Sequence, residues 1–360
     1  MSNPVKVAVI GAGWYAAQSH IPTLKSRTDV VLDGVSRLGA EELTRVRDHF
    51  GFAFASEDYR ELLARKPDVV VVASPHQMHF DHCLAALDAG AHVLCEKPMT
   101  LQPSQAWILV DHAKKLGLEL LLANGFHYLP GIVELRQALQ GGAVGRIEHV
   151  SCNFVSATRA VFEGDLGLAR WQTHFFRPDK STWQDADQGG GFAYGQLSHS
   201  IALLLWLTGL EANAVSAHNY PSGGIDLCNA ASVMCSSGAV VSISGAAALP
   251  EGKRALLRFL ITGSEGVMEI ELDRDRAVLH RHDGSDRDFS VVPGQWVYHC
   301  EGPIHALVDR ATGVSVNRST GANGAATVSV IAALLESAKD GGISVDVIRS
   351  KTRFLEGDHP

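Results

Sequence analysis

The sequence predicts an α/β protein with an N-terminal doubly wound parallel sheet and a C-terminal α+β domain built on a large, mainly antiparallel sheet. Three observations favour this fold class. Up to residue 124, apolar strand-like runs alternate with helical patterns, as in parallel sheets that helices cover on both faces. After residue 125, strand candidates follow one another directly, as antiparallel strands do. The length of 360 residues also exceeds what one hydrophobic core commonly supports.

The N-terminal domain, residues 1–124, is assembled from strand and helix candidates in turn. A glycine closes the helix candidate over 79–90 at its C-terminal end, which is a common helix stop. The expected strands cover 5–13, 30–37, 67–74, 91–97 and 118–126, and the expected helices cover 14–27, 40–50, 59–66, 79–90 and 103–117.

The C-terminal domain, residues 125–345, has a different rhythm and precedes a polar tail over 346–360. The segment 161–188 carries aromatic and charged residues without clear periodicity, which is typical of functional loops. The expected strands are 146–160, 214–220, 228–237, 239–249, 254–263, 267–273 and 277–283, and the expected helices are 128–140, a segment after the glycines at 189–191, 304–313 and 326–341.

Composition excludes several classes of partner. The net charge of −8 and the lack of a Lys or Arg run speak against nucleic acid and against an anionic membrane. The six cysteines are scattered without a CxxC pair, which predicts reduced thiols in the cytoplasm. We expect neither a signal peptide nor a membrane span. The 17 histidines show no ligand-spaced cluster, so no metal is predicted.

The stretch GAGWYA, residues 11–16, follows a strand and opens a helix. In that context a G-x-G-x-x-A pattern predicts a dinucleotide site. Gly11 permits the tight turn, and Gly13 lets the backbone approach a pyrophosphate at the helix N-terminus. Trp14 and Tyr15 follow these glycines and are expected to contact the cofactor. The alternative is a turn that is merely structural.

The end of the second strand discriminates between cofactors. An acidic residue there binds the ribose 2′-hydroxyl of NAD, whereas an arginine accommodates the 2′-phosphate of NADP. Asp33 lies too early in the strand, and the tip is Ser36-Arg37. The sequence therefore favours NADP and leaves NAD possible. Alternatively, Arg37 is a solvated residue at a strand end.

The stretch GGGFAYGQLSHS, residues 189–200, leads three glycines into an apolar helix with one polar pair. Gln196 and His199 are three residues apart and share a helix face. Taken alone, a buried histidine with a satisfied hydrogen bond is the better interpretation.

Three segments, GAGWYAAQSHIPTL, ASPHQMHFDHCLAALDAGAHVLCEKPMT and GGGFAYGQLSHSIALLLWLTG, together resemble the Gfo/Idh/MocA family of NAD(P)-dependent oxidoreductases. The most specific part is Glu96-Lys97-Pro98. The resemblance implies an N-terminal Rossmann domain and a C-terminal sheet whose open face packs against a partner. A homodimer or homotetramer through that sheet is expected.

The resemblance also implies roles for single residues. Lys97 would lie beside the nicotinamide and hydrogen-bond the substrate hydroxyl. His199 would be the second catalytic residue, which turns the interpretation of this histidine from structural to catalytic. Cofactor contacts are expected from Ser74, Pro75, His76, His79 and Glu96.

The chain departs from the family's G-G-G-x-x-x-D-x-x-x-H pattern at one position. Gly195 stands where the aspartate is expected, so we predict that the glycine opens volume for a bulkier substrate. Gln196 is the nearest polar substitute. Further substrate contacts are predicted for Tyr194, Asp185, Asp187 and His127, with Phe162, Trp171, Phe175, Phe176 and Trp183 stacking on a sugar or forming the loop's own small core.

These inferences predict reversible hydride transfer between a nicotinamide and a secondary alcohol of a sugar, sugar derivative, glycoside or cyclitol. His199 would act as the general base, and Lys97 would stabilise the alkoxide. Two alternatives stay open: redox-neutral cleavage of a glycoside, and an NADP-binding sensor without catalysis.

Overall fold

The computed structural model describes residues 3–165, 174–177, 180–314 and 316–349. The chain forms two compact units. Among the described residues, the first unit contains 3–125, 174–177, 180–182, 300–314 and 316–325, and the second contains 126–165, 183–299 and 326–349. The first unit therefore also contains two segments from later in the chain, one that ends at residue 182 and one over 300–325, which the predicted domain limit at residue 124 assigned to the C-terminal domain.

The first unit is built on a six-stranded sheet in the order β3-β2-β1-β4-β5-β6, in which every pair of neighbours is parallel. β4 consists of four valines that are all fully buried, as expected for a strand covered on both faces. The doubly wound parallel sheet predicted from the sequence is confirmed. The strands are β1 (Val5–Ile10), β2 (Val30–Ser36), β3 (Phe54–Ser56), β4 (Val69–Val72), β5 (His92–Cys95) and β6 (Leu120–Leu122).

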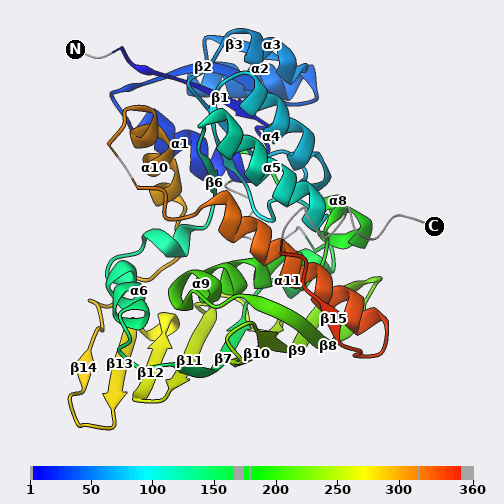
Figure 1. Cartoon of the computed structure of the whole chain (residues 1–360). Coiled ribbons are helices and arrows are strands. Elements are labelled where there is room, and N and C mark those ends of the chain that lie inside the picture. The colour runs from blue at the N-terminus through cyan, green and yellow to red at the C-terminus, as the bar shows by residue number, and fades with distance from the viewer. Residues whose placement is uncertain (1–2, 166–173, 178–179, 315, 350–360) are drawn as a thin grey trace. The chain divides into compact units, whose positions relative to one another are not determined.

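Helices form two layers around this sheet. α1 contacts α2 and α10, whereas α4 contacts α3 and α5, and Figure 1 shows α1 and α10 on one side of the sheet with α4 and α5 on the other. Helix α10, which begins at Glu301, returns to this unit from late in the chain. The helices are α1 (Ile21–Lys25), α2 (Ala40–Phe50), α3 (Tyr59–Ala64), α4 (His79–Asp88), α5 (Pro103–Leu116) and α10 (Glu301–Ala311), with a π-helical turn η1 (Ala16–His20) and a 3-10 turn η2 (His76–Met78).

The second unit is built on a nine-stranded sheet in the order β14-β13-β12-β11-β7-β10-β9-β8-β15. Its neighbours are antiparallel except for the parallel pair β7 and β10, so the predicted mainly antiparallel sheet is confirmed. The strands are β7 (Ile147–Val155), β8 (Ala212–Ser222), β9 (Ile225–Cys235), β10 (Val240–Ala246), β11 (Leu256–Gly263), β12 (Gly266–Glu271), β13 (Arg276–Arg281), β14 (Arg287–Asp288) and β15 (Val345–Asp346).

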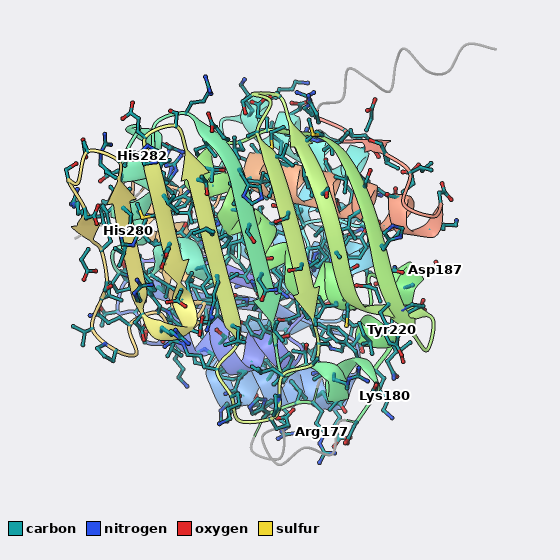
Figure 2. All side chains as sticks on the ribbon, turned by 90° about the horizontal axis from the view of Figure 1, so that it is seen from below. Arg177, Lys180, Asp187, Tyr220, His280 and His282 are labelled. Atoms are coloured by element: carbon teal, nitrogen blue, oxygen red, sulfur yellow. The ribbon has the colours of Figure 1, made fainter. Side chains whose placement is uncertain are left out.

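One face of the nine-stranded sheet carries helices, and the other is open as far as the described residues go. Helix α9 packs on β7 and on α6, while Figure 2 looks onto the opposite face, which none of the helices that the structure describes covers. Exposure alternates along β9 and β10, and Met234, Val240 and Leu260 are exposed. The remaining elements are α6 (Ile132–Gln140), α7 (Arg159–Phe162), α8 (Lys180–Gln184), α9 (Ser198–Thr208), α11 (Gly321–Lys339), the 3-10 turns η3 (Gly125–Tyr128), η5 (Ala186–Gln188) and η7 (Leu272–Arg274), and the π-helical turn η6 (Ala193–Leu197).

Within the described residues, no helix combines the length and the apolar character that crossing a bilayer requires.

Candidate dinucleotide site and histidine helix

The glycine turn after β1 packs directly on the backbone of the turn after β4. Gly11 has a φ of +84°, and a Cβ there would overlap the backbone nitrogen of Ser74. At Gly13, in contrast, the one contact that a Cβ would make with the described residues is with the Gly11 carbonyl oxygen, at 3.9 Å. Gly11 is thus required for packing, while the space over Gly13 is available for a close backbone approach by a pyrophosphate.

The second strand ends at Ser36, beside this turn. The Arg37 guanidinium donates through Nη1 to the carbonyl of Ala12 at 3.3 Å and through Nε to that of Leu38 at 3.2 Å. Burial lowers the pKa of Arg37, opposed by the charge of Glu42. Asp33 instead accepts two hydrogen bonds from Arg65, at 2.7 and 2.9 Å, and is committed to that pair.

The turn after β4 is held by two buried histidines. The ring of His79 lies 2.8 Å from the carbonyl of Ser74 on one side and 2.8 Å from that of Pro98 on the other. Burial lowers the pKa of His79, while these two carbonyl acceptors favour the charged ring. Burial also lowers the pKa of His82 to about 4, and its Nδ1 shares a hydrogen bond of 2.9 Å with the Ser74 hydroxyl. His76 is buried, whereas Pro75 is exposed.

Glu96 and Lys97 follow β5 and are charge partners. The Glu96 carboxylate lies 2.7 Å from His20 Nε2 and accepts from the Lys97 amide at 3.0 Å. Burial acts to raise the pKa of Glu96, but the His20 hydrogen bond and the Lys97 charge outweigh it and lower the pKa. Burial lowers the pKa of Lys97, opposed by Glu96 and Cys300. A lysine with a lowered pKa is suited to proton transfer.

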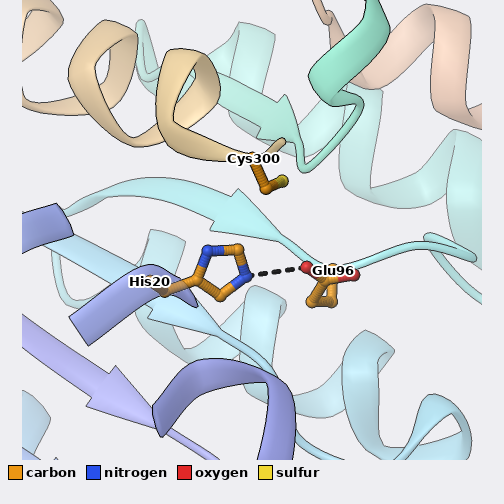
Figure 3. Close-up of side chains that lie close together, drawn as sticks. All are labelled: His20, Glu96 and Cys300. Atoms are coloured by element: carbon orange, nitrogen blue, oxygen red, sulfur yellow. Dashed lines mark hydrogen bonds and ion pairs between the residues drawn. The ribbon is translucent and has the colours of Figure 1, made fainter. Parts of the chain in front are cut away.

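His20, Glu96 and Cys300 bring one nitrogen, one oxygen and one sulfur ligand atom within 4.8 Å of one another (Figure 3). Sequence analysis did not find this group, because its members come from η1, the end of β5 and the start of α10. Such a donor set could hold a divalent cation. In the structure, however, His20 and Glu96 are directly hydrogen-bonded, and the Cys300 thiol donates to the Ala123 carbonyl at 3.4 Å.

In the second unit, the glycines before α9 lie so close to neighbouring oxygen atoms that side chains would not fit at Gly190 and Gly191. A Cβ on Gly190 would lie 2.8 Å from the carbonyl oxygens of Trp183 and Asp185, and one on Gly191, with a φ of +97°, would overlap the Asp226 carboxylate. Asp226 is buried and accepts from the Ala193 amide at 2.8 Å. The glycines therefore let a buried carboxylate cap the π-helical turn.

Asp226 is a residue that sequence analysis missed. It lies on β9 and also accepts from the Asn229 side chain at 2.5 Å. Burial raises its pKa, although the hydrogen bonds from Asn229 and Ala193 act in the opposite direction. Burial, aided by the charge of Asp226, raises the pKa of Tyr194 to about 12.

His199 lies in the first turn of α9, and its side chain is largely enclosed, with 8% of the residue exposed. Three aromatic rings present their edges or faces to the imidazole at near-perpendicular angles. Phe126, Phe154 and Tyr298 have ring centroids 6.0, 6.5 and 5.0 Å from that of His199. The π-helical turn just before it is a feature that recurs at functional sites.

The expectation that Gly195 opens volume is wrong. An added Cβ would lie 2.9 and 3.0 Å from Cζ and Cε1 of Phe162 and 3.3 Å from Cζ3 of Trp183. These two rings contact each other edge to face, with centroids 5.9 Å apart. Aromatic side chains of the 161–188 segment therefore fill the space beside the glycine, and no larger residue fits there without movement.

The other predicted substrate residues range from exposed to fully buried. Gln196 is partly exposed on the π-helical turn, and Asp187 is exposed, with its amide bonded to Asp185 at 3.0 Å. His127 is fully buried and stacks on Trp206, with the rings 4.9 Å apart and 9° from parallel. Trp171 lies outside the described residues.

A six-stranded parallel sheet with a glycine turn after its first strand, joined to a unit with a large mainly antiparallel sheet, defines a dinucleotide-binding class of protein. The family model described as the oxidoreductase family with an NAD-binding Rossmann fold matches residues 5–124, and that of the GFO/IDH/MocA C-terminal domain matches residues 132–269. The chain belongs to this oxidoreductase family.

Two named relatives show the range of the family. The chain is 33% identical over 227 residues to a D-glucoside 3-dehydrogenase of Escherichia coli, covering 62% of this chain and 60% of the relative. It is 30% identical over 149 residues to an inositol 2-dehydrogenase/D-chiro-inositol 3-dehydrogenase of Lactiplantibacillus plantarum, covering 40% of this chain and 42% of the relative. The matches thus span only about half the length of these relatives.

Solved structures share the fold over nearly the whole chain. A levoglucosan dehydrogenase in complex with NADH and L-sorbose superposes with a TM-score of 0.79 at 21% identity, covering 97% of this chain and 100% of the other. An oxidoreductase domain protein from Kribbella flavida gives a TM-score of 0.80 at 21% identity, with coverage of 97% and 100%. At this identity, the likeness establishes the fold.

Proposed function

We propose that the protein is an NAD(P)-dependent dehydrogenase that acts on a secondary alcohol of a sugar, sugar derivative, glycoside or cyclitol. Family membership and the dehydrogenase names of its relatives support the reaction class. The observation that carries the proposal is the glycine turn, in which Gly11 is locked against Ser74 while the space over Gly13 is available. A bound nicotinamide would supply the hydride acceptor or donor.

The residue roles are part of the proposal. Lys97, whose pKa burial lowers, would hydrogen-bond the reacting hydroxyl and stabilise negative charge on its oxygen. Glu96, fixed by His20, would position Lys97 by its charge. His199 would remove the hydroxyl proton as general base. The aromatic rings around it would exclude water from the imidazole.

We further propose that NADP is preferred over NAD. Arg37 follows the second strand directly, and the carboxylate of Asp33 is committed to Arg65, so no acidic side chain of that strand would repel a 2′-phosphate. Gly11, Gly13, Trp14, Tyr15, Ser36, Arg37, Ser74, Pro75, His76, His79 and Glu96 are the proposed cofactor residues. Gln196, Tyr194 and Asp187 are kept as proposed substrate residues, and buried His127 supports the aromatic packing around Trp206.

The decisive experiment measures hydride transfer across a panel of sugars, glycosides and cyclitols, with NADP⁺ and NAD⁺ in parallel, for the wild type, Lys97→Ala and the exposed-lysine control Lys115→Ala. We expect turnover by the wild type and the control, and a loss of at least about 100-fold in Lys97→Ala. Cofactor binding without reduction would reject the dehydrogenase proposal. Product analysis for cleaved glycosides would then distinguish redox-neutral cleavage from a sensor.

Other expectations stay predictions. We propose that the open face of the nine-stranded sheet binds a second copy, since Met234, Val240 and Leu260 are exposed on its strands. Light scattering at micromolar concentration would show a monomer if this is wrong. The scattered cysteines remain the basis for expecting the cytoplasm. The division into a dinucleotide-binding domain over 1–124, a substrate-binding and oligomerisation domain over 125–345 and a tail over 346–360 also remains a prediction.

A further inference from the structure

A short aromatic segment, His174–Phe176, packs on the residues that we assign to the dinucleotide site. It belongs to the first unit, although His174 follows Trp14 of the glycine turn by 160 positions in the sequence. The indole Nε1 of Trp14 donates to His174 Nδ1 at 2.6 Å, and the two rings lie 13° from parallel. The segment is thus attached to the turn that would face the pyrophosphate.

The next two residues of the segment cover arginines. The guanidinium of Arg37 lies 4.0 Å over the ring of Phe176, and that of Arg45 lies 4.2 Å over the ring of Phe175. Phe175 also packs against Phe50 of α2, with ring centroids 5.5 Å apart. The two rings contact each other, with centroids 4.8 Å apart, and Arg45 also lies 5.8 Å over the ring of Phe176. Their nearest arginines differ, because Phe175 lies closest to Arg45 of α2 and Phe176 lies closest to Arg37 at the tip of β2.

Within the part of the chain that the structure describes, the hydrogen bonds of Arg37 leave the Nη2 edge of its guanidinium available for an acceptor. Phe176 covers its flat face, and its bonds to the carbonyls of Ala12 and Leu38 use Nη1 and Nε. Planar guanidinium groups bind phosphate oxygens in the plane of the fork, so a covered face does not obstruct this interaction. The ring also holds the side chain in one orientation and removes water from it, which strengthens the attraction to an anion.

We propose that Phe176, held in place through the bond between His174 and Trp14, is a specificity-determining residue that positions Arg37 for the 2′-phosphate of NADP. This inference rests on the proposed dinucleotide function and adds a residue from outside the sheet to it. The alternative is that the segment forms only a small core on α2. The two phenylalanines separate these interpretations, because only Phe176 contacts Arg37 closely while Phe175 covers α2.

Isothermal titration calorimetry on the full chain tests this with NADP⁺, NAD⁺ and adenosine 2′,5′-bisphosphate as ligands. A cation–π contact of this kind corresponds to roughly a 3- to 30-fold change in dissociation constant. We expect Phe176→Leu to weaken NADP⁺ and the bisphosphate by such a factor and NAD⁺ by less than about 2-fold. Phe175→Leu, the matched control, should lower thermal stability without changing the preference for NADP⁺, measured as the NAD⁺ dissociation constant divided by the NADP⁺ dissociation constant. Trp14→Phe, which loses the bond to His174, should reduce this ratio, as Phe176→Leu does.

Each outcome decides between the claims. Equal weakening of NADP⁺ and NAD⁺ in Phe176→Leu, or tighter binding, would overturn the specificity role; tighter binding would mean that the segment obstructs the site. If the wild type binds NAD⁺ and NADP⁺ equally, this inference fails while the dehydrogenase proposal stands. If it binds neither, both fail. Should Phe176→Leu not fold, Trp14→Phe alone decides: an unchanged ratio refutes the proposal.

Discussion

Gly195→Ala tests whether the space beside the π-helical turn is filled. At an uncrowded helical position, replacing glycine by alanine stabilises a protein by about 1 kcal/mol. At position 195, the new Cβ would lie 2.9 and 3.0 Å from Cζ and Cε1 of Phe162, closer than van der Waals contact allows. Overpacking of this kind costs roughly 1–3 kcal/mol. We therefore expect the free energy of unfolding to fall by as much as about 2 kcal/mol, the overpacking cost less the helix gain.

The assay is a double-mutant cycle with Phe162→Leu, in which chemical and thermal unfolding give the free energy of unfolding of the wild type, both single variants and the double variant. Leucine lacks the two ring atoms that lie closest to position 195, so the clash should disappear in the double variant. In that background Gly195→Ala should become neutral or stabilising by about 1 kcal/mol. The reasoning is refuted if Gly195→Ala stabilises the wild type, or if its effect is the same with and without the Phe162 ring.

Three further substitutions test single contacts. Burial raises the pKa of Asp226 in the folded protein, so the wild type should lose stability as pH rises from the unfolded pKa of about 4 through the raised folded pKa. Asp226→Asn should not show this loss when the free energy of unfolding is measured in urea at a series of pH values. Parallel curves for the two proteins would contradict the prediction. The pKa of Asp275 is lowered by the hydrogen bond from Arg254 and by backbone amides. Asp275→Asn should therefore lower the free energy of unfolding by about 2 kcal/mol at pH 7, and this difference should shrink as pH falls below about 4. A difference that does not depend on pH would rule this out. Gly11→Ala should lower stability and abolish dinucleotide binding in calorimetry, because its Cβ would overlap Ser74; retained binding would disprove it.

The parallel sheet and the glycine turn were predictable because they depend on local patterns. The run of four valines that forms β4 and the glycine at position 11, whose φ is +84°, are both recognisable from residues that are neighbours in sequence. Asp226 was not predictable, since its hydrogen bond to Ala193 joins residues 33 apart on different elements. The same holds for Cys300, which meets His20 and Glu96 only because α10 returns to the first unit.

The error at Gly195 has a physical cause of the same kind. A glycine in place of a larger residue indicates either open volume or a close neighbour, and the sequence pattern alone does not distinguish them. Phe162 and Trp183 stand 33 and 12 positions away in the printed sequence, in a segment without periodicity. Their packing on Gly195 became evident only from the positions of the rings. Long-range packing of aromatic side chains therefore decided the meaning of this glycine.

The charge of Glu96 leads to a last prediction, on the pH dependence of hydride transfer. Burial lowers the pKa of Lys97, and the Glu96 carboxylate acts against this by favouring the ammonium form. Glu96→Gln keeps an acceptor for His20 but removes the negative charge, so the pKa of Lys97 should fall further. If loss of the Lys97 proton limits the reaction at high pH, the alkaline limb of kcat/KM must then move to lower pH.

A merely structural role of Glu96 predicts a different result. Weakening of the bond to His20, which is 2.7 Å long in the wild type, would lower stability and reduce kcat/KM equally at all pH values. His20→Gln is the matched control, because it perturbs the same hydrogen bond and leaves the carboxylate beside Lys97. An alkaline limb that stays in place in Glu96→Gln, or that moves as far in His20→Gln, would show that the Glu96 charge does not set the protonation of Lys97.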